Sequence, residues 1–144
     1  ALQDAMSFVL SREDGSIPGE RATVIVWELG RAANRLDLVR RAISYGLTLR
    51  TFLPGWWARL GFLHVEIAKD RTKAEHCLRE AAAWFDPNRT KGRYRNKELH
   101  DQCLSVAEFY AGKKNAEGDR ALRELVEALE ALRLKNTITG FRGP

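Results

Sequence analysis

Residues 56–85 read WWARLGFLHVEIAKDRTKAEHCLREAAAWF, and this stretch decides the fold. Its first half carries an apolar stripe with steps of four, three and four residues, made of Trp56, Leu60, Leu63 and Ile67. Its second half carries another stripe at helical spacing, made of Ala74, Cys77/Leu78, Ala81 and Trp84/Phe85. Between them, Thr72 with Glu75 three residues later has the pattern of a capping box, which marks a helix start. The stretch therefore predicts two helices joined by a short turn.

Helical periodicity also dominates the chain before this stretch. Helices are predicted over residues 4–12 and 20–34, and over a third segment that is closed by Pro54-Gly55. The β-branched run 22–26 also fits a strand, but no second strand exists to pair with it, so a helix is favoured. The expected inward faces are Ile25, Leu29 and Ala32/Ala33 in the second helix, and Leu36, Val39, Ile43 and Leu47 in the third.

Two more helices are predicted after the central stretch. One ends at Gly112 and carries Leu99, Cys103, Val106 and Tyr110 on one side. The other covers residues 116–135, with leucines at steps of three, four and three: Leu122, Leu125, Leu129 and Leu132. Short connections between helices favour antiparallel neighbours, so we expect an all-α fold of helical hairpins, as a short stacked solenoid or an irregular bundle. We expect one domain over 1–135 and a flexible tail over 136–144.

A weak internal repeat accompanies the hairpins. The segment Trp27-Glu28-Leu29-Gly30 recurs as Trp57-Ala58-Arg59-Leu60-Gly61, which puts the two glycines 31 residues apart. Small residues and a proline follow at intervals: Ala42, Ala74, Ala81, Pro87, Ala121 and Ala128. This pattern resembles the tetratricopeptide repeat, and the fit is best at Trp57, Leu60, Gly61, Ala74, Ala81 and Pro87. The resemblance covers residues 22–134 and implies a scaffold that presents a concave face to a peptide or a partner helix.

Positive charge is concentrated in one segment. The chain has a net charge of +5, and residues 87–97, PNRTKGRYRNK, carry that whole excess without an acid. We call residues 87–97 the basic segment. Its cations stand at every second position, so an extended backbone would place them along one edge: Arg89, Lys91, Arg93, Arg95 and Lys97. Such an edge suits several phosphates of a nucleic acid, with Tyr94 stacking on a base, and it suits an acidic peptide equally. A solvated connection between two helices explains the same residues.

Other features indicate surfaces rather than chemistry. Trp56 and Trp57 are adjacent on a helix and diverge, so one is expected in the core and the other as an exposed interface anchor. The leucine stripe of the last helix suits the core, and it also suits pairing with a second copy of the chain. Three glutamates step by three along the same helix and alternate with arginines, which predicts a salt-bridged solvent face: Glu124, Glu127 and Glu130 with Arg120, Arg123 and Arg133.

Catalytic and metal-binding motifs are missing from the sequence. It has no glycine-rich phosphate loop, no nucleophile elbow and no His-Glu-x-x-His, so we expect neither an enzyme nor a cofactor. His76-Cys77 and His100 with Cys103 are the only metal-ligand candidates, but adjacent helical residues point about 100° apart. We therefore expect no metal, with both cysteines in the core.

Compartment and function follow as expectations. The longest uncharged apolar run, 22–27, is far shorter than the roughly 20 residues that span a bilayer, and no signal peptide is visible. Two cysteines do not make a disulfide framework, which favours a reducing cytoplasm. The sequence favours a non-enzymatic adaptor that binds a protein partner through a groove, the basic segment and the Trp56-Trp57 pair. The alternative is a small basic nucleic-acid-binding subunit of a larger ribonucleoprotein or DNA complex.

Overall fold

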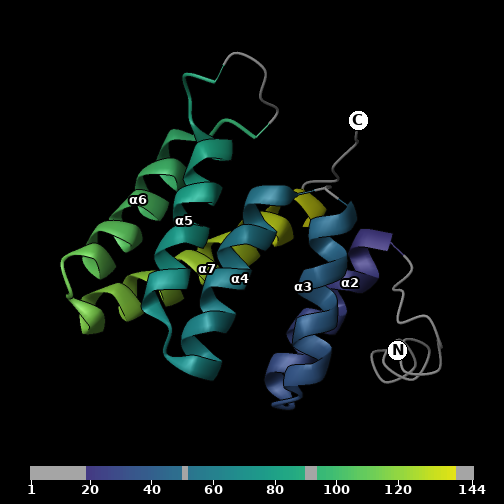
Figure 1. Ribbon diagram of the computed structural model, residues 1–144. Helices are drawn as coiled ribbons and strands as arrows, with labels where there is room; N and C mark the ends of the chain where they lie inside the picture. The colour runs from purple at the N-terminus through teal and green to yellow at the C-terminus, as the bar shows by residue number, and fades with distance from the viewer. Residues whose placement is uncertain (1–18, 50–51, 90–93, 139–144) are drawn as a thin grey trace. The chain divides into compact units, whose positions relative to one another are not determined.

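The computed structural model describes residues 19–49, 52–89 and 94–138, and within those ranges it contains helices and no strands (Figure 1). The all-α prediction is therefore confirmed. The described helices are α2 (Gly19–Ala32), α3 (Leu36–Leu49), α4 (Leu53–Ala68), α5 (Arg71–Phe85), α6 (Lys97–Ala111) and α7 (Asn115–Ile138). The helix predicted over 4–12 lies outside the described residues. None of these helices combines the length and the apolar character that a bilayer crossing requires.

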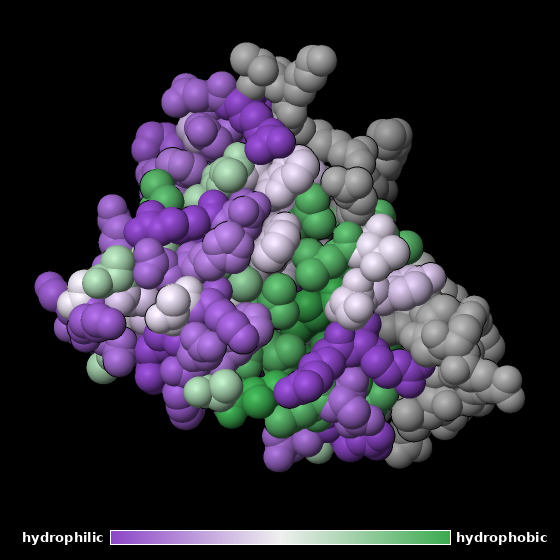
Figure 2. Space-filling model, in the orientation of Figure 1, coloured by the Kyte–Doolittle hydropathy of each residue, from purple (hydrophilic) through white to green (hydrophobic). Residues whose placement is uncertain are grey.

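The chain divides into two compact units, and the boundary between them falls after Trp56, inside α4. The first unit contains α2, α3 and the first turn of α4. The second contains the remainder of α4 with α5, α6 and α7. Within the second unit α6 packs against both α5 and α7, and hydrophilic residues cover the visible faces of α5 and α6 (Figure 2).

Trp27 sets the orientation of α2 in the first unit. Its side chain is fully buried and meets the Trp56 ring edge to face, with 6.5 Å between ring centroids. The predicted inward face was wrong, because Ile25 and Leu29 are only half-buried and both alanines after them are exposed. The buried face is instead Thr23, Val24, Val26, Trp27 and Gly30. Burying the large indole gains more free energy than burying Ile25, so α2 turns its Trp27 side inward.

The start of α4 also differs from the prediction. Pro54 and Gly55 do not close the third helix; they lie in the first turn of α4, which begins at Leu53. Proline fits a first helical turn because the N–H that it lacks would have had no partner inside the helix. In α3 the stripe is confirmed at Val39 and Ile43, whereas Leu36 is 39% exposed.

Helices α5, α6 and α7 bury most of the predicted stripes, whereas Leu60 and Ile67 of the α4 stripe are only half-buried. The residues buried as expected are Ala74, Cys77, Leu78, Ala81 and Phe85 in α5, Leu99, Cys103, Val106 and Tyr110 in α6, and Leu122, Leu125 and Leu129 in α7. The predicted cap of α5 was wrong, since Asp70 and not Thr72 is the N-cap. The Asp70 carboxylate accepts a hydrogen bond from the Lys73 N–H at 3.0 Å. The C-cap predicted at Gly112 is confirmed, and α7 continues to Ile138, three residues into the expected tail.

Three helical hairpins share the same turn. Only three non-glycine residues of the described chain have positive φ, namely Asn34, Lys69 and Lys113 at 55°, 52° and 61°. Each follows the first helix of a hairpin: α2–α3, α4–α5 and α6–α7. Backbone N–H groups just after these residues return to the last turn of the helix, as from Arg35 to Gly30 O at 2.7 Å and from Lys114 to Phe109 O at 2.8 Å. A left-handed residue at this place is a common way to end a helix.

Buried positions recur at fixed distances from these left-handed residues. Ten residues before them lie Val24, Arg59 and Cys103; seven before them lie Trp27, Phe62 and Val106; nine after them lie Ile43, Leu78 and Leu122. The turns at 34, 69 and 113 are 35 and 44 residues apart, and the longer interval contains the longer connection, 86–96. This register differs from the sequence repeat, because Gly30 precedes its turn residue by four positions and Gly61 by eight.

Arg59 is a charged residue at a position that is apolar in the other two hairpins. Its side chain is 2% exposed, and it donates a hydrogen bond to Glu130 Oε1 of α7 at 2.8 Å. Glu130 therefore does not belong to the solvent face that its spacing from Glu124 and Glu127 predicted. A buried guanidinium needs a nearby carboxylate, which explains why this glutamate turns inward.

The close approach of α3 to the start of α4 is tested by Gly46→Ala. A Cβ atom at Gly46 would overlap the buried Trp56 ring, so the substitution is expected to lower the free energy of unfolding by roughly 1–3 kcal/mol. Gly112→Ala is the control, because its Cβ would meet only two backbone oxygens, at 3.5 and 3.8 Å, and we expect a change within about 0.5 kcal/mol. Denaturant unfolding measures both, and a stable Gly46→Ala variant would contradict this packing.

The Arg59–Glu130 pair is tested by comparing a single and a double substitution. Glu130→Gln should cost roughly 2–4 kcal/mol of unfolding free energy, because it removes the carboxylate charge 2.8 Å from the buried Arg59 guanidinium. Arg59→Met combined with Glu130→Leu should recover most of that loss, since apolar side chains of similar size need no partner. Thermal unfolding followed by circular dichroism compares the variants. A double variant less stable than Glu130→Gln would show that the loss of stability in Glu130→Gln does not come from the unpaired charge.

Candidate functional site

The ends of the basic segment are fixed to the α5–α6 hairpin. At the α5 end the Asp86 carboxylate accepts a hydrogen bond from Asn88 N–H at 2.9 Å, and Arg89 N–H donates to Asp86 O at 3.1 Å, which closes a turn. At the α6 end Asn96 N–H donates to Phe85 O at 2.8 Å, while the Asn96 side chain caps α6 through Leu99 N–H at 3.0 Å. The connection therefore leaves and re-enters the hairpin at one place.

Trp84 anchors both described flanks of the segment. The Arg89 guanidinium carbon lies 4.1 Å from the Trp84 ring centroid, and an Arg89 N–H also donates to Ala83 O at 3.0 Å. From the other flank, the Tyr94 ring meets Trp84 edge to face with 6.2 Å between centroids. The prediction had placed Trp84 in the core stripe of α5, but it is half-buried and forms the base of this cluster. We call Trp84, Arg89 and Tyr94 the aromatic clamp.

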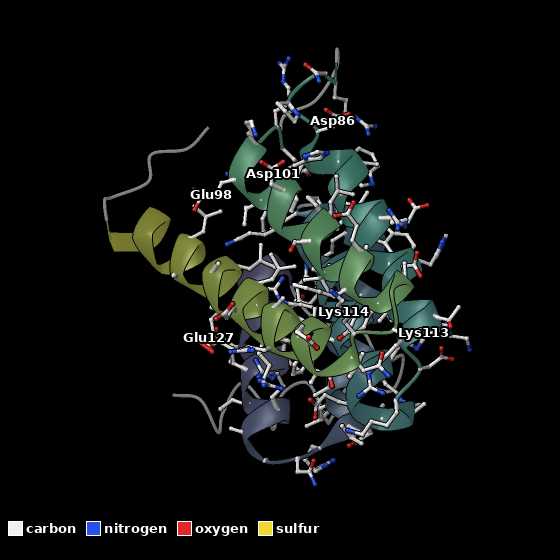
Figure 3. All side chains as sticks on the ribbon, turned by 90° about the vertical axis from the view of Figure 1, so that its left-hand side faces the viewer. Asp86, Glu98, Asp101, Lys113, Lys114 and Glu127 are labelled. Carbon is white, nitrogen blue, oxygen red and sulfur yellow. The ribbon has the colours of Figure 1, made fainter. Side chains whose placement is uncertain are left out.

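The five cations of the basic segment do not share one described edge. Arg89 folds back onto Trp84, and Lys97 is the first residue of α6, where it pairs with Asp101 at 2.7 Å. Arg95 is exposed, and Lys91 and Arg93 lie outside the described residues. Acidic side chains stand beside the segment, with Asp86 before it and Glu98 and Asp101 at the start of α6 (Figure 3). The local excess of positive charge is therefore smaller than the segment alone indicates.

Trp56 and Trp57 diverge as predicted. Trp56 is 1% exposed, whereas Trp57 is half-buried and meets the exposed His76 ring edge to face at 6.4 Å between centroids. The interface anchor expected at Trp57 is therefore only partly exposed, and its ring contacts the His76 ring in the second unit.

The two cysteines are buried thiols. Burial raises the pKa of Cys77 to about 11, with a smaller contribution from Glu80, and it raises the pKa of Cys103 to about 12. Both sulfurs are therefore protonated and poorly nucleophilic at neutral pH. His100 Nδ1 lies 3.0 Å from Asp101 Oδ1. Across the residues that the structure describes, no group of three or more His, Cys, Asp or Glu side chains is placed to hold a metal ion.

Sequence analysis missed a polar cluster that joins α5, α6 and α7. Arg71, the first residue of α5, forms two hydrogen bonds with the Asp119 carboxylate, at 3.1 Å to Oδ1 and 2.7 Å to Oδ2. Tyr110 of α6 donates its hydroxyl hydrogen to Asp119 Oδ1 at 2.8 Å. The Arg71 hydrogen bond and the Tyr110 hydroxyl hold the pKa of Asp119 below its usual value. Burial and Asp119 together raise the pKa of Tyr110. No local sequence pattern links residues 48 positions apart, so only the fold brings them together.

A polar hollow of about 390 Å³ lies beside this cluster. We call it the lysine hollow. Its wall comes from two turns of the second unit, with Lys69, Asp70 and Arg71 on the α4–α5 side and Tyr110, Lys113 and Asn115 on the α6–α7 side. Lys113 lies at the opposite end of α6 from Glu98 and Asp101 (Figure 3). The hollow is therefore separate from the basic segment.

Comparison with protein-family models, curated proteins and solved structures finds no match for this chain.

The charge state of Asp119 should control acid stability. Because its folded pKa is depressed, the ionised form stabilises the fold above the unfolded value of 3.8, and this contribution is lost as the pH falls through the folded pKa. Asp119→Asn should therefore lower the unfolding midpoint at pH 7, and its deficit against the parent chain should shrink below about pH 4. Urea unfolding across this pH range measures the difference. A deficit that stays constant from pH 7 to acid would contradict a role for the charge.

Proposed function

We propose that this chain is a non-catalytic helical adaptor whose α5–α6 connection binds an acidic segment of a protein partner. The observation that carries the proposal is the aromatic clamp, which holds both flanks of the basic segment against Trp84. A connection fixed at both ends loses less conformational freedom when a partner binds, so more of the contact energy becomes affinity.

The described contacts favour a protein partner over a single-stranded nucleic acid. Arg89 already covers a face of Trp84, and the half-buried Tyr94 packs its ring against the same residue. Base stacking needs an open aromatic face, which this arrangement uses internally. Asp86 and Glu98 beside the segment would also repel a continuous phosphate backbone, whereas an acidic protein segment can place its carboxylates beside the exposed cations and away from these two side chains.

The helical architecture supports a scaffold role for the module. Three hairpins with equivalent turns and equivalent buried positions support a repeated hairpin unit of the kind that tetratricopeptide-like scaffolds use. A groove that receives a partner helix is part of this proposal. The buried, protonated thiols fit a reducing compartment such as the cytoplasm.

Binding of two labelled probes tests the proposal. A glutamate-rich peptide should bind with a dissociation constant in the micromolar range, and Arg93→Glu with Arg95→Glu should weaken it by about tenfold or more. The control is Arg40→Glu with Arg120→Glu, which makes the same change of charge at two exposed positions on α3 and α7 and should leave binding intact. Trp84→Leu keeps the charge but removes the clamp, so it should weaken the peptide by roughly threefold to tenfold.

The second probe is a labelled single-stranded oligonucleotide. If it binds more tightly than the peptide and its affinity falls steeply with salt, the nucleic-acid alternative replaces the adaptor proposal. The proposal also fails if the peptide does not bind, or if the control pair weakens it as much as Arg93→Glu with Arg95→Glu.

A further inference from the structure

Two lysines in strained backbone meet at one place in the second unit. Lys69 and Lys113 have φ values of 52° and 61°, and both line the lysine hollow. This left-handed conformation brings the Cβ of an ordinary side chain too close to the following carbonyl oxygen, and glycine, which has no Cβ, removes that cost. The third residue of this kind, Asn34, is a residue type that tolerates the conformation. Lysine therefore occupies two turns where glycine would give a more stable chain.

The charges of these lysines are not used within the described chain. Both side chains are exposed, and neither forms an ion pair or a hydrogen bond with a described residue. Other charges around the hollow are compensated. Arg71 pairs with Asp119 at 2.7 Å, and Asp70 caps α5 with Lys73 Nζ at 3.9 Å from its second oxygen. Two lysine ammonium groups thus provide the uncompensated charge of the hollow.

We propose that the lysine hollow is a binding site for a small soluble molecule that carries a phosphate or diphosphate group. Lys69 and Lys113 approach it from two different turns, and Arg71 with the Tyr110 hydroxyl forms the wall between them. A group with two or more negative charges uses both ammonium groups at once, which a single carboxylate does not. Arg71 and Thr72 at the start of α5 and Asn115 at the start of α7 also line the hollow, and the first turn of a helix favours a bound anion.

The size of the hollow sets the size of the ligand. Its volume of about 390 Å³ is at the lower end of the range for small-molecule sites and exceeds the needs of one phosphate ion. The phosphate group would lie between the two lysines, and the rest of the molecule would occupy the remaining space. The proposal does not depend on the function of the basic segment, which lies at the other end of α6.

Replacing both lysines by glycine distinguishes an effect on ligand binding from an effect on the stability of the fold. Lys69→Gly with Lys113→Gly should raise the thermal unfolding midpoint by roughly 2–8 °C, because the strained backbone is relieved. The same variant should weaken pyrophosphate binding by about tenfold or more, since two charge-assisted contacts are removed. A change that merely damaged the fold would lower both quantities, so opposite signs identify a binding role.

Calorimetric titration in a phosphate-free buffer measures the binding. The parent chain should bind pyrophosphate with a dissociation constant on the order of 0.1 mM, more tightly than inorganic phosphate or succinate. Lys114→Gln is the matched control, because this neighbour of Lys113 does not line the hollow (Figure 3). Asn34→Gly controls for the backbone change alone, and both controls should keep the affinity of the parent chain.

Changes in backbone amide chemical shifts during a titration with pyrophosphate show where the ligand binds. The expected shifts are at Lys69, Thr72, Lys113 and Asn115, and they should persist in the Arg93→Glu and Arg95→Glu variant. The proposal is overturned if the parent chain does not bind pyrophosphate, if succinate binds equally well, or if Lys114→Gln weakens binding as much as the glycine variant does. Shifts confined to residues 94–97 would assign the anion to the basic segment and would also overturn it.

Discussion

A left-handed backbone at one residue per hairpin is the constraint on which the rest of the structure depends. Where Asn34, Lys69 and Lys113 adopt positive φ, the first helix of each hairpin ends and the chain reverses within a few residues. The reversal fixes which positions of the two helices face each other. The same offsets from the turn are consequently buried three times, as with Trp27, Phe62 and Val106. Hydrophobic burial then stabilises an arrangement that the turns have already selected.

The charged side chains of the second unit fall into two groups, those that pair with each other inside the fold and those that are exposed to solvent. Arg59 with Glu130, and Arg71 with Asp119, tie α7 to α4 and α5 through side chains that are mostly buried. The charges of these residues are paired within the fold, so they are poor candidates for ligand contacts. Lys69 and Lys113 of the two turns are exposed, as is Arg95 of the basic segment, which precedes α6 at the end opposite to Lys113. Both proposed sites therefore use charge that the fold itself does not require.

Sequence periodicity predicted the helices well because an apolar stripe such as Leu99, Cys103, Val106 and Tyr110 records its own burial. The predictions from periodicity and motifs failed where a single residue had a larger energetic effect than the surrounding pattern. Trp27 turned α2 away from the expected face, and Asp70 capped α5 ahead of the better motif at Thr72. The basic segment was visible because its five cations lie within eleven residues of the sequence. The lysine hollow was not, because nothing in the types of Lys69 and Lys113 reveals positive φ, and no local pattern joins two turns 44 residues apart.

The backbone conformation at Lys69 and Lys113 is therefore the most direct test of the account. Scalar couplings and chemical shifts from nuclear magnetic resonance report φ for each residue in solution. The account predicts positive φ at Asn34, Lys69 and Lys113, with helical shifts on both sides of each. Negative φ at the two lysines, with a helix continuing through either turn, would contradict the hairpin repeat and the strain on which the lysine hollow rests.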